Sequence, residues 1–146
     1  MAIVQAVCNV FKRELLKGTH DLDGGATYKI ALYTSSATLG AATANYAATS
    51  NEVGSGGGYT TGGNTLTSPT VTMSTTTSYV DFADTSWTSA SFTANGAFIY
   101  QSAGDASSGD NAFLVLAFGG DFTATSGTFT IQFPTAGGGS ELLRLT

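Results

Sequence analysis

The side chains that could carry catalysis are few, and their spacing does not favour it. The chain has a single histidine, His20, and a single cysteine, Cys8. No G-x-S-x-G motif supplies a nucleophile for that histidine to activate. The segment THDLDGG places Asp21 and Asp23 beside His20 in part of the spacing of a calcium loop, but the bidentate glutamate that completes such a loop is missing. The segment is therefore interpreted as a turn that ends a helix and opens the first strand.

Paired carboxylates offer no better site. The candidates are Asp81, Asp84, Asp105, Asp110 and Asp121. Asp105 and Asp110 lie in SAGDASSGDN, which predicts a solvated hairpin loop, and Asp81 alternates outward in SYVDF. General acid and base catalysis needs a carboxyl group in a desolvated pocket. We therefore expect no catalytic residues, no metal site and no cofactor, and we predict that the chain is not an enzyme.

The glycine-rich stretch NEVGSGGGYTTGGNTL, residues 51 to 66, does not match a phosphate loop. No Gly-Lys-Ser/Thr follows GSGGG, and no helical pattern begins after it. Glycine allows positive φ and a close approach of two backbones. Tyr59 and Leu66 are the large side chains available to anchor the stretch. We interpret it as backbone geometry that serves a strand pairing and a protein contact.

Composition limits the kinds of partner. Charged residues make up 10% of the chain, against about 25% in a typical soluble domain, so short polar side chains must form most of the surface. A net charge of −5 with five Lys and Arg argues against nucleic-acid binding, which needs clustered cations. Cys8 has no disulfide partner and is interpreted as a small buried hydrophobe. No signal peptide is recognised at the apolar N-terminus, and Lys12 and Arg13 come too soon for a spanning helix, so no membrane partner is expected.

One helix is expected, roughly from residue 4 to 17, within an N-terminal arm of residues 1–18. Ile3, Val7, Val10, Phe11 and Leu15 recur at spacings of three, four and seven. Cations gather near the end of this segment and a glycine follows it, as at many helix C-termini. The first few residues fit an extended arm equally well. The apolar stripe needs to be covered, either by the sheet or by a neighbouring copy.

From residue 27 to residue 146 the pattern is that of an all-β body. Short apolar or alternating runs recur, namely YKIALY, TVTM, SYVDF, ASFTA, GAFIY, FLVLAF, TFTIQF and ELLRL. Asn95 and Gly96 suit a type I′ turn between two of these runs. We predict a single domain, an antiparallel β-sandwich or jelly-roll-like barrel with one short N-terminal helix. The Gly/Ala/Thr-rich stretch at about 34–63 is predicted to be a long loop, a kind that is commonly functional.

Two aromatic residues, Trp87 and Tyr100, are candidates for a platform on which sugars stack. For Trp87, packing at the edge of the sandwich is the commoner arrangement. A glycan-binding site at this place requires the Trp87 ring to be exposed.

Five segments carry a resemblance to a known group of proteins. They are FKRELLKGTHDL, YKIALYTSSATL, YAATSNEVGSGGGYTTGGNTL, DFADTSWTSASFTANGAFIY and TSGTFTIQFPT, which together span residues 11 to 135. In order and wording they resemble small virion proteins of tailed bacteriophages. The glycine segment is one residue longer here, and Asn95 stands where that group carries a cation. The resemblance implies a particle component, with capsid cement or decoration as the favoured role. The alternative is a phage tail tube, fibre or receptor-binding protein.

The resemblance also implies partners. We expect a homotrimer or homodimer that is made in the bacterial host cytoplasm and binds the major capsid protein on the outer surface of the virion. The N-terminal segment and the 40–63 loop are predicted to make the contacts, because apolar and small-residue segments gain from being covered. The expected capsid or subunit contact residues are Ile3, Val7, Val10, Phe11, Tyr46, Val53 and Tyr59.

Overall fold

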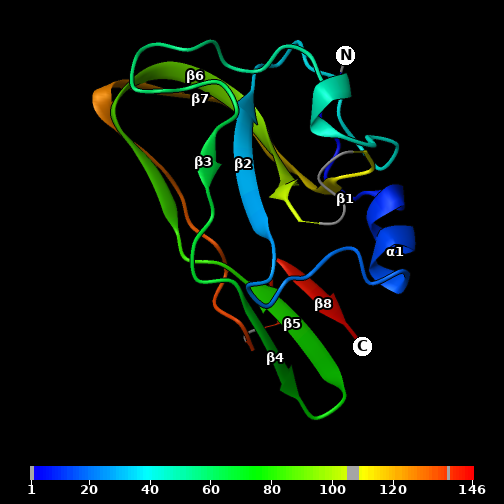
Figure 1. Ribbon diagram of the computed structural model, residues 1–146. Coiled ribbons are helices and arrows are strands. Elements are labelled where there is room, and N and C mark those ends of the chain that lie inside the picture. The colour runs from blue at the N-terminus through cyan, green and yellow to red at the C-terminus, as the bar shows by residue number, and fades with distance from the viewer. Residues whose placement is uncertain (1, 105–108, 138) are drawn as a thin grey trace.

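The chain forms two antiparallel sheets and one short helix, as seen in a computed structural model (Figure 1) that describes residues 2–104, 109–137 and 139–146. The larger sheet contains, in spatial order, β1 (Ala6–Val7), β7 (Ala112–Ile131), β6 (Thr85–Ala103), β2 (Thr27–Tyr33) and β3 (Asn64–Thr65). The smaller sheet contains β4 (Thr70–Ser74), β5 (Thr77–Asp81) and β8 (Leu143–Leu145). The predicted all-β, sandwich-like class is confirmed, and over the described residues neither sheet closes into a barrel.

The helix α1 (Asn9–Leu16) is shorter than the predicted 4–17. The residues before it are extended because their backbone groups have partners in other segments. Ala6 and Val7 pair with β7, and the Cys8 N–H donates to the Phe113 carbonyl at 3.0 Å. The apolar stripe is covered by the sheet: Phe11 is 1% exposed, and its ring lies 4.4 Å from that of Phe113. Burying one such ring stabilises the fold by about 2 to 3 kcal/mol.

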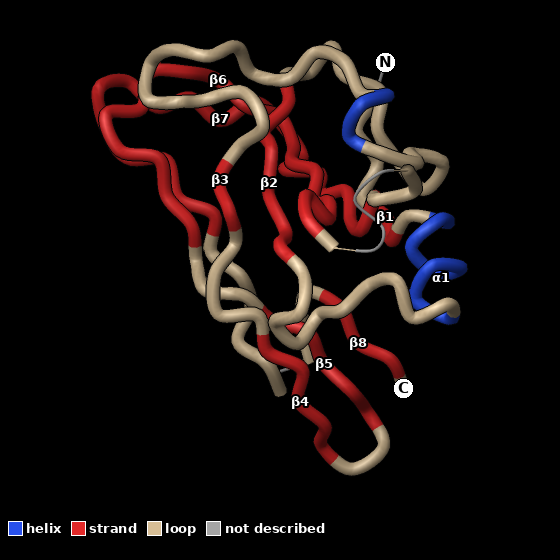
Figure 2. The backbone as a smooth tube through the Cα atoms, viewed as in Figure 1, coloured by secondary structure: helices blue, strands red, loops and turns tan. Residues whose placement is uncertain are grey.

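The largest structural unit is the hairpin of β6 and β7, which forms the long curved wall seen in Figure 2. Each strand joins two of the predicted runs, so the type I′ turn predicted at Asn95 and Gly96 is wrong. Neither residue has a positive φ, and Gly96 pairs with Ala117 inside the sheet. The Asn95 side chain donates across the sheet to Asp121 Oδ1 at 2.8 Å. The hairpin connection instead lies between Ala103 and Ala112, where SAGDASSGDN predicts it; Asp105 lies outside the described residues.

The segment THDLDGG forms the predicted turn between α1 and β2. The Asp23 N–H donates to Asp21 Oδ1 at 3.0 Å, which closes a local turn. His20 is 5% exposed, and its Nδ1 lies 2.8 Å from the Tyr28 hydroxyl. The Phe11 ring packs edge-on against it at 4.9 Å. His20 therefore fastens the helix to the sheet.

Because His20 is buried, we expect the stability of the protein to depend on pH. Burial lowers the pKa of His20, and the backbone of Asp110 and the Glu14 carboxylate oppose this shift only in part. A folded-state pKa below the unfolded value gives stability that is present above pH 6.5 and is lost as the pH falls. Between pH 7.5 and pH 5.5 we expect the free energy of unfolding to fall further in the wild type than in a His20→Gln variant. Urea unfolding at the two pH values measures this difference, and equal losses in both proteins would contradict it.

Candidate assembly surface

The N-terminal segment and the long loop form one surface. The Val4 N–H donates to the Leu39 carbonyl at 2.9 Å, and the Leu39 N–H donates to the Ala2 carbonyl at 3.1 Å. One step further, the Asn9 N–H donates to the Ala41 carbonyl at 2.8 Å. Figure 1 shows the start of the chain beside this loop at the top of the molecule. Two segments that lie some thirty-five positions apart thus become neighbours.

Together they line a shallow, open concavity of about 590 Å³. We call it the assembly surface, and it is formed by Ala2, Val4, residues 38–44, Ala48 and Thr49. Residues 2–11 and 30–51 contain no Asp, Glu, Lys or Arg, so the surface is uncharged. Val4, an apolar residue that lines this surface, is 58% exposed. Small, uncharged side chains are inexpensive to desolvate and allow a partner's backbone to approach closely.

Local hydrogen bonds hold this loop in one shape. The loop contains the 3-10 helix η1 (Tyr46–Ala48), and Asn45 Oδ1 accepts the Ala48 N–H at 2.9 Å. Asn111, the residue before β7, accepts the Tyr46 N–H at 3.0 Å through its side-chain oxygen. A loop that is ordered before binding pays less conformational entropy when a partner covers it.

The far end of the loop is anchored on Glu52. Its Oε2 accepts the Tyr46 hydroxyl at 2.6 Å, and its Oε1 accepts the Tyr59 hydroxyl at 2.6 Å and the Gly62 N–H at 2.7 Å. The Tyr59 oxygen in turn accepts the Leu32 N–H from β2 at 2.9 Å. Burial, and then the hydrogen bond to Glu52, raise the pKa of Tyr59. Sequence reasoning missed Glu52, although it is the one charged residue between Lys29 and Asp81.

The glycine-rich stretch lies against β6, as the backbone interpretation predicts. Gly58 has φ +82°, and a Cβ placed on it would lie 2.5 Å from the Thr88 carbonyl oxygen. Both expected anchors are buried, Tyr59 at 2% and Leu66 at 5% exposure. This stretch therefore fixes the loop to the sheet through backbone contact.

The predicted contact residues do not all lie at the surface. Phe11, Val53 and Tyr59 are buried in the hydrophobic core, so their assignment as contact residues is corrected. The sheet needs large apolar side chains to cover it, and these three serve that purpose. The other four predicted contact residues are half-buried and pack against the core, namely Ile3, Val7, Val10 and Tyr46. Cys8 is fully buried as predicted, and burial raises its thiol pKa to about 12.

The stacking platform for sugars is also corrected. Trp87 is 3% exposed and packs edge-on against Phe92 and Phe129, with ring centroids 6.5 and 6.1 Å away. Tyr100 is 4% exposed and stacks on Tyr46 at 4.4 Å. Neither ring presents a free face, which a stacked sugar requires.

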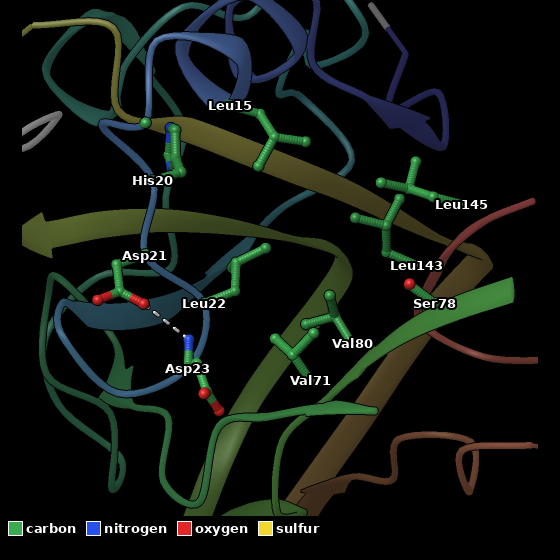
Figure 3. A pocket seen from close by; sticks show the side chains of 11 residues that line it. Leu15, His20, Asp21, Leu22, Asp23, Val71, Ser78, Val80, Leu143 and Leu145 are labelled. Atoms are coloured by element: carbon green, nitrogen blue, oxygen red, sulfur yellow. Dashed lines mark hydrogen bonds between the residues drawn. The ribbon is translucent and has the colours of Figure 1, made fainter. Parts of the chain in front are cut away.

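A second concavity lies between α1 and the smaller sheet, with a volume of about 500 Å³ (Figure 3). Leu15 and Leu22 line one side, and Val71, Val80 and Leu143 line the other. Figure 3 shows these side chains pointing toward a common space. We call it the apolar groove. His20 and the Asp21–Asp23 turn form its rim, and over the described residues no group of three or more metal-ligating side chains is found.

No known protein family, no curated protein and no solved structure matches the chain. Within residues 2–104, 109–137 and 139–146, none of the helices has the length and apolar character needed to cross a membrane.

Proposed function

We propose that this chain is a non-enzymatic structural protein of a bacteriophage virion, a capsid cement or decoration protein that binds the major capsid protein on the outer shell. The observation that carries the proposal is the assembly surface. It is built from the two segments expected to make the capsid contacts, it is uncharged, and hydrogen bonds hold its loop in place. The order and wording of the five segments quoted above supply the virion context.

The physical logic is that of seam binding. A cement protein stabilises a shell by covering area across the boundary between capsid subunits, and many symmetric copies multiply weak contacts into avidity. An uncharged surface of alanine, threonine and glycine suits this role, because no buried charge is left without a partner when the surface is covered. The buried aromatic residues and the all-β body supply a rigid support behind it.

The deciding experiment is a cryo-EM map of the assembled particle in which this chain is located. Density at regular positions on the outer head lattice, with the assembly surface turned toward the shell, is the expected result. Density confined to the tail or its tip would overturn the cement role and assign the chain to the tail tube, fibre or receptor-binding class.

A matched pair of variants tests the surface itself. Ala42 lies on the assembly surface and is exposed, so Ala42→Glu should leave the fold intact but bury a carboxylate in the complex. We expect occupancy on particles to fall at least about tenfold, since an unpaired buried charge costs several kcal/mol. Ala83→Glu is the control, because Ala83 is also exposed but precedes β6 and does not line this surface. Quantitative electrophoresis of purified particles measures occupancy, and equal occupancy of both variants would contradict the assignment of the surface.

A further inference from the structure

The strand β4 is a terminal strand of the smaller sheet and has one free side. It pairs with β5 in an unbroken register from Thr70 opposite Asp81 to Ser74 opposite Thr77. All five of its residues are exposed. In an antiparallel pair the hydrogen-bonding groups alternate, so every second residue of β4 points its N–H and C=O away from β5. Such an edge is a template for another strand.

Soluble proteins usually block an edge of this kind with a charge, a proline or a bulge. Residues 53–80, which include the whole β4–β5 turn, contain no charged side chain. Pro69 lies before the strand rather than in it, and the β4–β5 register has no bulge. The edge of β4 is therefore open to pairing.

The apolar side chains of β4 extend the apolar groove to this open edge. Val71 stands opposite Val80, and Val80 stands opposite Leu143 on β8, so the three share one face of the sheet. Met73 lies on the same face, two positions after Val71. Val71 is 44% and Met73 is 71% exposed. This row of apolar side chains therefore ends at β4, and no described strand pairs with the outer side of β4.

We propose that β4 pairs with β4 of a second copy of this chain, antiparallel and about a two-fold axis at Thr72. In this register Thr72 faces Thr72 of the second copy, Val71 faces its Met73, and Thr70 faces its Ser74. The two small sheets then form one six-stranded sheet, and both apolar grooves open on the same face. Each apolar side chain gains an apolar neighbour, and the threonines and serines meet one another.

The sequence of the strand favours a second copy over a different partner. The segment is self-complementary about Thr72, as the isologous interface of a two-fold dimer requires. A charged strand that pairs with its own copy can place like charges opposite one another, which is destabilising. Because β4 has no charged residue, its self-pairing carries no such penalty. A chain of net charge −5 repels its own copies, so an uncharged edge is the place where two copies can approach. This inference concerns the purified chain and does not depend on the proposed capsid role.

Disulfide trapping tests the interface and its register. Directly opposite residues in an antiparallel pair have Cα atoms about 4.5 to 5.5 Å apart, within the range that a disulfide spans. We expect Thr72→Cys to form a covalent dimer under mild oxidation, seen on a non-reducing gel. Cys8 is fully buried and gives little background. The control is Thr128→Cys, at an exposed position on β7.

A mixing experiment makes the register test sharper. Val71→Cys and Met73→Cys should crosslink far more when mixed than either does alone, because each faces the other in the proposed pairing. Thr72→Lys should raise the dimer dissociation constant at least about tenfold in analytical ultracentrifugation, since two like charges meet, whereas Thr128→Lys should not.

The outcomes separate cleanly. A Thr72→Cys dimer together with the mixed Val71→Cys and Met73→Cys dimer supports the pairing as stated. Crosslinking of Thr72→Cys no faster than that of Thr128→Cys overturns it, as does a wild-type chain that stays monomeric at millimolar concentration. Efficient crosslinking of the single Val71→Cys variant would overturn the register.

Discussion

Replacing Gly63 by alanine should lower the free energy of unfolding by about 4 kcal/mol. Gly63 has φ +73°, and a Cβ on it would lie 1.8 Å from the Ile30 carbonyl oxygen and 2.7 Å from the Ala31 Cα. Both neighbours are backbone atoms of β2 in the fully buried centre of the sheet. The left-handed conformation costs a residue with a Cβ about 1 to 2 kcal/mol. Relieving the contact requires β2 or β3 to shift, which costs about 1 to 3 kcal/mol more. Urea unfolding with a fitted midpoint and slope measures the loss.

Gly54 supplies the control. It lies in the same glycine-rich stretch, it has no positive φ, and a Cβ on it would meet nothing within 4 Å. Gly54→Ala should therefore leave the unfolding free energy within about 0.5 kcal/mol of the wild type. Equal stability of the Gly63→Ala and Gly54→Ala variants would show that β3 does not need its close approach to β2.

The contrast between Gly63 and Gly54 separates what the sequence predicts about this stretch from what only the structure shows. The missing lysine and the missing helix after GSGGG argue against a phosphate loop and favour a backbone role for the stretch. The close backbone contacts at Gly58 and Gly63 agree with that role. Which glycine is indispensable does not follow, because the answer depends on how near β2 passes. The same applies to Asn95 and Gly96. The dipeptide favours a hairpin turn, but in the fold it lies inside β6. There the Asn95 side chain donates a hydrogen bond to Asp121, and a Cβ on Gly96 would lie 2.7 Å from the Leu116 carbonyl oxygen.

Strand positions were predictable where alternation and composition agreed. The runs YKIALY, TVTM, SYVDF and ELLRL match β2, β4, β5 and β8, and the loop predicted at 34–63 lies between the end of β2 and the start of β3. The two long strands were each predicted as two, because glycine and asparagine interrupt their apolar pattern. In the fold, the continuous partner strand supplies hydrogen bonds across these interruptions, and this tertiary effect is invisible to a local pattern.

The candidate surface was predictable in its segments and not in its residues. Phe11, Val53 and Tyr59 lie in the segments predicted to be covered by a partner, but as apolar side chains they are buried in the core of the chain itself. The small residues that do line the assembly surface, such as Ala42, carry little signal of their own. A more informative signal for this surface is the low charge of residues 30–80, in which Glu52 is the one charged residue.

That carboxylate is the second place where a single substitution should have a large effect. Glu52→Ala removes the acceptor for the hydroxyls of Tyr46 and Tyr59 and for the Gly62 N–H. Hydrogen bonds to a charged group contribute about 1.5 to 3 kcal/mol each. Because Glu52 is half-buried and water replaces part of the loss, we expect the unfolding free energy to fall by about 3 to 4 kcal/mol. Most of this loss comes from Tyr59, because its buried hydroxyl, which accepts the Leu32 N–H, no longer has an acceptor for its own proton.

Glu52→Gln separates charge from shape. The amide keeps one oxygen acceptor in place of the carboxylate pair and fills the same volume, so its cost should be about 1 to 2 kcal/mol, between wild type and Glu52→Ala. Hydrogen exchange adds a local reading: protection of the Gly62 and Leu32 amides should fall further in Glu52→Ala than in Glu52→Gln. If both variants unfold at the wild-type urea midpoint, Glu52 does not anchor the loop. The assembly surface would then have to owe its shape to the Asn45 and Asn111 bonds alone.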